Sequence, residues 1–161
     1  MWNVAQVNIA RIIADSVNDP IMKTFVDQLD HINSLGEASP GFVWRLKEES
    51  GNATQIHFND DPRVIVNMSV WETVEDLIAF AYKSVHREVM SKRSSWFEKM
   101  NAPYQALWYV PKYSFPSVED SRFRLAYLQQ NGPTPMAFTF AKRFSPDDYV
   151  SYLSQKTSLN S

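Results

Sequence analysis

The chain has 161 residues and a formal net charge of −2, with 44% hydrophobic and 21% charged residues. This length and balance are sufficient for one globular domain with a hydrophobic core. Basic residues are spread along the chain without forming a block, so we expect no nucleic-acid binding. The chain contains no cysteine, which excludes disulfides, iron–sulfur clusters and thiol nucleophiles. Its absence fits a reducing cytoplasm, where we expect the protein to be located.

The first ten residues, MWNVAQVNIA, lack the basic segment followed by an apolar stretch that marks a signal peptide. Elsewhere in the chain, no apolar run approaches the roughly 20 residues that a membrane-spanning helix needs. We therefore expect no signal peptide and no association with a membrane.

The first third of the chain predicts a strand followed by a helix. Residues 2–10 alternate in polarity as a strand does, and the more apolar set, which includes Val7, is expected to face the helices. Asp19 followed by Pro20 is typical of a helix start, and apolar residues recur at helical spacing from there. Gly36 is a typical helix end.

The middle of the chain predicts two more strands, a helical region and a fourth strand. The strands are expected at residues 42–48, 64–71 and 105–112. Thr73, with Asp76 three residues later, resembles a capping box, so a helix is expected after it and a second helical segment from about residue 86 to 100. The resulting order, strand–helix–strand–strand–helix–strand, is the ferredoxin-like split βαβ arrangement.

The last part predicts a further helix at residues 117–131, a fifth strand at 137–144 and a polar tail at 151–161 that frays. We therefore expect a single α+β domain over residues 1–150, with an antiparallel sheet and helices on one face. The other face of such a sheet must also be covered. We expect this face to be covered in a homodimer, in which two sheets form an α+β barrel. Alternatively, the extra helix predicted at residues 117–131 covers part of this face.

The most informative segment runs from Trp71 to Phe97 and reads WETVEDLIAFAYKSVHREVMSKRSSWF. If the second helical segment is continuous, then His86, Met90, Arg93 and Phe97 share one stripe. Polar heads buried on an apolar stripe need partners, which an anionic or carbonyl-bearing ligand would supply. The alternative is that His86 caps the junction between two helices and Arg93 extends to solvent or pairs with a carboxylate.

This segment resembles a bacterial family described only as a domain of unknown function, within the dimeric α+β-barrel superfamily. The N-terminal strand with Trp2 and Gln6-Val7-Asn8 and the strand Trp108-Tyr109-Val110-Pro111 share the resemblance, which spans roughly residues 2–145. The family is distantly similar to spheroidene monooxygenase. The resemblance implies a ferredoxin-like fold, pairing of two sheets in a dimer and a small-molecule pocket. Superfamily members include antibiotic-biosynthesis monooxygenases that need no cofactor, haem-degrading enzymes and non-catalytic proteins, so the fold does not determine the function.

Three functions remain open at this point. In the first, a cofactor-independent monooxygenase-like enzyme acts on an apolar or aromatic substrate, with His86 in proton transfer and Arg93 stabilising negative charge on oxygen. The second is a haem protein with His86 as axial ligand, and the third is a non-catalytic binding or dimerisation module. The expected partners are a small-molecule ligand and a second copy of the chain.

The side chains expected to bind the substrate are large and mostly aromatic. For each of the tryptophans, the alternative role is ordinary core packing. The expected substrate-binding residues are Trp71, Met90, Trp96, Phe97 and Trp108. No metal is expected, because neither His31 nor His57 has the converging ligands of a metal site around it in the sequence.

Overall fold

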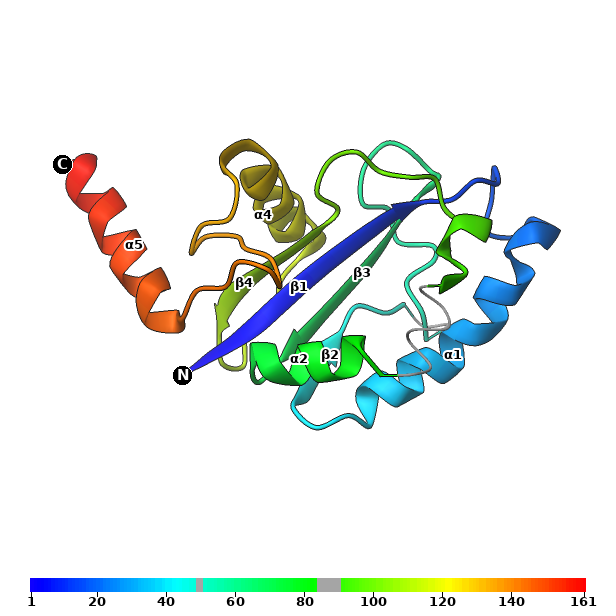
Figure 1. Cartoon of the computed structure of the whole chain (residues 1–161), viewed down its shortest axis with the longest axis horizontal. Coiled ribbons are helices and arrows are strands. Elements are labelled where there is room, and N and C mark those ends of the chain that lie inside the picture. The colour runs from blue at the N-terminus through cyan, green and yellow to red at the C-terminus, as the bar shows by residue number, and fades with distance from the viewer. Residues whose placement is uncertain (49–50, 84–90) are drawn as a thin grey trace.

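The computed structural model describes residues 1–48, 51–83 and 91–161, and at its centre these residues form an antiparallel sheet of four strands (Figure 1). The spatial order of the strands is β2-β3-β1-β4. This order confirms the ferredoxin-like α+β fold that the sequence predicts. The strands are β1 (Trp2–Arg11), β2 (Phe42–Arg45), β3 (Val64–Trp71) and β4 (Gln105–Pro111).

Two of the helical elements begin at capping residues that the sequence predicts. Asp19 accepts a hydrogen bond from the Ile21 amide, and Thr73 accepts one from the Asp76 amide. Both predicted helix starts are confirmed. The helical elements are η1 (Pro20–Met22), α1 (Lys23–Glu37), α2 (Val74–Ala81), η2 (Arg93–Ser95), α4 (Val118–Asn131) and α5 (Pro146–Leu159).

The register of the central strands separates the sheet into a polar face and an apolar face. Gln6 of β1 lies opposite Ser69 of β3, and Asn8 lies opposite Asn67. Residues directly opposite each other in antiparallel strands point to the same face, so these four polar side chains share one side of the sheet. The intervening residues of β1, such as Val7, point to the other side.

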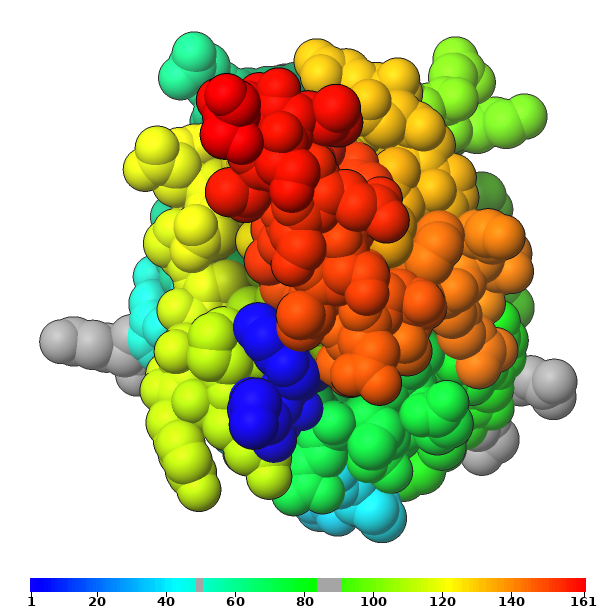
Figure 2. Space-filling view, turned by 90° about the vertical axis from the view of Figure 1, so that its left-hand side faces the viewer, coloured from blue at the N-terminus to red at the C-terminus, as the bar shows by residue number. Residues whose placement is uncertain are grey.

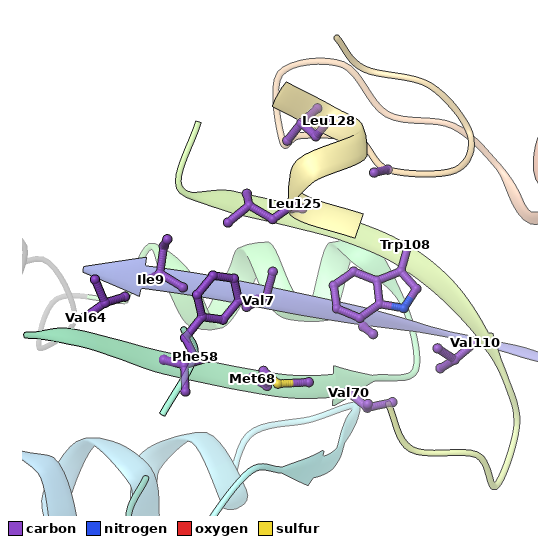
Figure 3. Packing of buried hydrophobic residues seen from close by; sticks show 14 residues of the cluster. Val7, Ile9, Phe58, Val64, Met68, Val70, Trp108, Val110, Leu125 and Leu128 are labelled. Carbon is purple, nitrogen blue, oxygen red and sulfur yellow. The ribbon is translucent and has the colours of Figure 1, made fainter. Parts of the chain in front are cut away.

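The apolar face packs against α4. Val7 and Trp108 belong to the same buried cluster as Leu125 and Leu128 of α4 (Figure 3). The polar face meets the other helices, since Ala10 packs in one cluster with Phe25 of α1. Helices therefore lie on both faces, which corrects the expectation of helices on one face only. The reason is that the chain crosses the sheet again after β4 and buries the side that had been expected to remain open.

The connection before α4 shows how the chain covers this face. Phe115, which follows β4, stacks on Trp44 of β2 at a centroid distance of 5.4 Å and an interplanar angle of 9°. β2 and β4 are the two edge strands, so the connection reaches across the whole sheet. The uncovered face that motivated the homodimer is therefore absent. The homodimer itself stays a prediction, to be tested by light scattering after size exclusion.

The C-terminal part differs from expectation in two places. Residues 137–144 do not form a strand, because only Phe138 bridges to Leu107 of β4. The expected polar tail is mostly helical instead, since α5 starts with Pro146 after a capping box on Ser145. Tyr149 fixes α5 beside the N-terminal strand, with its ring edge-on to that of Trp2 at 5.4 Å. The N-terminal residues and the C-terminal helix accordingly lie side by side at the surface (Figure 2).

The segment after η2 is bound to the end of β1 by a cluster of charges. Arg11 donates to Glu98 at 2.5 Å and to Asp61 at 2.7 Å, and Arg63 donates to Glu98 at 2.7 Å. The hydrogen bonds from Arg11 lower the pKa of both Glu98 and Asp61. Because Glu98 follows Phe97 directly, this cluster fixes the position of Phe97 against the sheet.

Candidate functional site

A cavity of about 580 Å³ lies between the polar face of the sheet and the helices α1 and α2. This volume lies within the range of small-molecule sites. Its floor carries amides and a hydroxyl from β1, β3 and β4, namely Gln6, Asn8, Asn67, Ser69 and Gln105. Its roof is apolar and comes mainly from the two helices, with Phe25, Leu29, Ile32, Leu77 and Phe80. A polar floor under an apolar roof can hold a planar molecule and orient its polar atoms.

The centre of the floor is a hydrogen-bonded group around Ser69. The Gln6 side-chain amide donates to Asn67 Oδ1 at 2.7 Å and to Ser69 Oγ at 2.9 Å. The Trp71 indole N–H also donates to Ser69 Oγ, at 2.9 Å. Ser69 Oγ thus accepts two hydrogen bonds, and within the described part of the chain its own hydrogen has no acceptor. That hydrogen is available to a ligand oxygen.

One end of the cavity is aromatic. Trp71 is 1% exposed, and the ring of Phe80 stacks on it at 5.3 Å while the ring of Phe42 meets it edge-on at 5.4 Å. Gly36 of α1 permits this arrangement, since an added Cβ would lie 3.3 Å from the Phe80 ring. The flat faces at this end suit an aromatic ligand ring.

Two arginines also line the cavity, and their surroundings differ. Arg45 donates to Glu37 Oε1 at 2.7 Å and to the Gly51 carbonyl at 2.5 Å. Arg93 lies over the ring of Phe97 at 5.3 Å and over the ring of Tyr104 at 4.7 Å. In the described ranges, the Arg93 guanidinium forms no ion pair and no hydrogen bond.

Three of the predicted site residues line this cavity. Trp71, Arg93 and Phe97 contribute to its wall, so the structure brings them together. The predicted residues His86 and Met90 lie in the range 84–90, outside the described residues. Their predicted roles stay predictions.

The other two predicted residues lie elsewhere. Trp96 packs beside Phe25 and donates its indole N–H to Thr24 Oγ1 at 3.0 Å, so its polar end is satisfied away from the cavity. Trp108 lies opposite Ala5 in the sheet and therefore faces α4. Neither of these tryptophans lines this cavity, where Trp71, Arg93 and Phe97 meet.

The expected helical stripe also ends early. η2 finishes at Ser95, and Phe97 is already extended, because it bridges to Ile12 next to β1. Arg93 and Phe97 are in contact through a cation–π interaction. They do not lie on one face of a continuous helix, as the sequence predicted. The predicted helix therefore does not reach Met100.

The floor residues were not predicted as a site, although the sequence contains a signal for them. Gln6, Asn8 and Asn67 occupy alternate positions on strands that are otherwise apolar. Polar side chains on a covered sheet face are costly unless they contact water or a ligand. Their alternation indicated a mixed face, and the structure places this face on a cavity.

The described residues contain no group of three His, Asp or Glu side chains placed to hold a metal ion. His31 and His57, the histidines of the described ranges, do not line the cavity. In the same ranges, no helix has both the length and the apolar character of a membrane span.

Comparison with known proteins gives a family and distant structural neighbours. Residues 3–154 match the family described as a domain of unknown function (DUF3291). No curated protein matches the chain.

Among solved structures, a putative antibiotic biosynthesis monooxygenase from Nitrosomonas europaea is 14% identical, covering 71% of this chain and 94% of its own, with a TM-score of 0.45. SnoaB, a cofactor-independent oxygenase from Streptomyces nogalater, is 15% identical, covering 73% and 100%, with a TM-score of 0.45. A conserved protein from Methanosarcina mazei is 10% identical, covering 70% and 94%, with a TM-score of 0.46.

Proposed function

This chain belongs to the DUF3291 family, and because that description names no activity, we propose from the cavity that the protein binds a small, planar, largely apolar organic molecule. The observation that carries the proposal is the group of amides and a hydroxyl beneath an aromatic and aliphatic roof. Such polar groups are retained next to apolar surface when something pairs with them. A bound ligand provides both the apolar contact and the hydrogen bonds.

The ligand orientation follows from the two kinds of surface. Rings of the ligand stack in the aromatic end formed by Trp71 and Phe80. A carbonyl or hydroxyl oxygen of the ligand lies over the floor, where the Ser69 hydroxyl and the Asn67 amide donate to it. This arrangement fixes one edge of the ligand against the sheet.

The first prediction tests occupancy of the cavity. Ile32→Trp on α1 adds bulk to the roof and is expected to weaken binding of the neutral fluorescent probe N-phenyl-1-naphthylamine by about tenfold or more, because it fills space the probe needs. Fluorescence titration measures the effect. Ile21→Trp, at a position 52% exposed outside the cavity, is the matched control and is expected to bind as the original chain does. Equal affinity in both variants would remove the support for the site.

We further propose that the activity, if the bound molecule carries an acidic methylene beside a carbonyl, is a cofactor-independent monooxygenation. The substrate then supplies all four electrons: its CH₂ group and O₂ give a new carbonyl and one water. The enolate oxygen of the deprotonated substrate would lie over Ser69 and Asn67, whose donors stabilise its charge. The proton acceptor is expected to be His86, outside the described residues.

The second prediction concerns this reaction. With anthrone as the probe substrate, the original chain is expected to consume one O₂ per anthraquinone formed. Ser69→Ala is expected to lower kcat by about tenfold to 100-fold, since it removes a donor to the oxyanion. Oxygen uptake and absorbance follow the reaction. Ser121→Ala, at a buried serine outside the cavity, is the control. No turnover above the spontaneous rate would reject the enzymatic proposal and leave the binding proposal standing.

The alternative function, haem binding, requires an axial ligand, and no described histidine is placed to be one. Its axial ligand, His86, lies outside the described ranges, and neither His31 nor His57 lines the cavity. A haemin titration with no Soret shift would reject this alternative.

A further inference from the structure

The charges around the cavity are one-sided. In the described ranges, the side chains that line it include two arginines, Arg45 and Arg93, and no aspartate or glutamate. The whole chain has the opposite balance, with 18 acidic and 16 basic residues. Among the described residues, the carboxylates thus lie away from the cavity lining, which has a local positive charge.

The net positive charge of the cavity lining comes from Arg93. Arg45 is held by Glu37 at 2.7 Å, so this pair is neutral overall. Arg93 has no such partner in the described part of the chain. A cavity that contained only Arg45 would carry no net charge, and Arg93 therefore determines its sign.

Among the described residues, the position of Arg93 leaves its N–H donors without an acceptor. Its guanidinium lies over the rings of Phe97 and Tyr104, at 5.3 Å and 4.7 Å from their centroids. Ring faces contact the flat side of a guanidinium and orient it, but they accept no strong hydrogen bond from its N–H edges. Those edges match the two oxygens of a carboxylate. Both rings also line the cavity, so the cation is half-buried at its wall.

We infer that the ligand of this cavity is an organic anion, in which a planar apolar body carries an ionised acid group that binds Arg93. This inference rests on the proposed small-molecule site and specifies its ligand class. The body lies between the sheet and the two helices, with its rings toward Trp71. The acid group replaces water on the guanidinium, and no carboxylate from the described lining repels it. A neutral molecule of the same shape gains the contacts with the floor and the roof but not the ion pair with Arg93.

The third prediction compares two ligands that share the same naphthalene rings, of which only one carries a charge. 2-Naphthoate carries a carboxylate at neutral pH, while 2-naphthol has the same rings and is neutral. In competition with N-phenyl-1-naphthylamine, we expect 2-naphthoate to bind the original chain at least about tenfold more tightly than 2-naphthol. Arg93→Gln is expected to abolish this preference by weakening the binding of 2-naphthoate alone, and Arg93→Lys is expected to retain part of it because it keeps the charge.

The control removes an equal charge from the neighbouring position. Lys92 is exposed and does not line the cavity, so Lys92→Gln is expected to keep the full preference for 2-naphthoate. A long-range effect of net charge would instead reduce the preference equally in Lys92→Gln and Arg93→Gln, and this result would overturn the inference. Circular dichroism of each variant establishes that it is folded.

The outcomes separate this inference from the function on which it rests. If N-phenyl-1-naphthylamine binds in the cavity but 2-naphthol competes as well as 2-naphthoate, the anion inference fails and the binding proposal survives. If the probe binds Ile32→Trp and the original chain equally, the proposed site itself fails. A preference for 2-naphthoate that persists in Arg93→Gln also overturns the role of Arg93.

Discussion

Trp108→Ala is expected to lower the free energy of unfolding by about 3–5 kcal/mol while leaving ligand affinity unchanged. Trp108 is 1% exposed and packs with Leu125 and Leu128 of α4 on the apolar face of the sheet (Figure 3). Truncation removes a large buried ring and leaves a cavity on that face. The ligand cavity lies on the opposite face, separated from Trp108 by the sheet.

The measurement combines urea unfolding with titration of N-phenyl-1-naphthylamine under conditions where the variant is folded. Trp71→Ala is the matched comparison, because Trp71 is equally buried but lines the cavity. It is expected to lose similar stability and also at least tenfold in probe affinity. If Trp108→Ala weakened binding in the folded protein as much as Trp71→Ala, the assignment of the two tryptophans to opposite faces would be wrong.

The contrast between these tryptophans shows what strand periodicity can and cannot predict. Alternation in residues 2–10 correctly separated β1 into two sets of side chains, because the period of a strand is a local property. It did not tell which helices cover each set. That depends on where the chain goes after β4, and the stack of Phe115 on Trp44 is a contact between segments distant in sequence. Trp108 was therefore expected at the ligand pocket, whereas the structure places it facing α4.

Capping signals were the most reliable local predictors. Asp19 and Thr73 start helical elements as predicted, since each side chain accepts a hydrogen bond from a nearby amide. The same signal was present at Ser145, before Pro146, with Asp148 three residues later. The polar composition of residues 151–161 outweighed it in the prediction, and the helix α5 was missed. A helix that buries little, such as α5 with Tyr149 as its buried residue, has a weak apolar pattern.

The candidate site was only partly predictable for a related reason. Trp71, Arg93 and Phe97 were found because they are conspicuous residue types in one segment. Their meeting with Gln6 depends on register, since Gln6 pairs with Ser69 across 63 positions of sequence. Helical phasing failed beyond η2, because the backbone there turns to form the bridge of Phe97 with Ile12. Local periodicity cannot foresee such a tertiary contact.

The largest effect expected from a small change is at Gly41, in the turn between α1 and β2. Gly41 has φ +80°, and an added Cβ would overlap the Asp76 carboxylate and lie 2.6 Å from Asp76 Cβ. The clash includes the Cβ of Asp76, so rotating the carboxylate cannot relieve it fully. Asp76 also belongs to the N-terminal cap of α2, where its carboxylate accepts a hydrogen bond from the Thr73 hydroxyl at 2.8 Å. Gly41→Ala must therefore displace the start of α2.

We expect Gly41→Ala to cost about 2–4 kcal/mol of unfolding free energy, combining backbone strain at positive φ with the displaced cap. Gly51→Ala isolates the backbone contribution, because Gly51 also has a positive φ, +94°, but nothing lies within 4 Å of an added Cβ. We expect Gly51→Ala to lower the free energy of unfolding by about 1 kcal/mol. Urea unfolding measures both variants.

A double-mutant cycle with Asp76→Gly tests the contact itself. Asp76→Gly removes the atoms that an alanine at position 41 would meet, so the cost of Gly41→Ala in that background is expected to fall toward that of Gly51→Ala. An unchanged cost would mean that the contact with Asp76 is not the cause. Since α2 carries Leu77 and Phe80 over the cavity, a displaced helix start is also expected to weaken probe binding in Gly41→Ala but not in Gly51→Ala. The turn at Gly41 would then link the stability of the fold to the shape of the ligand site.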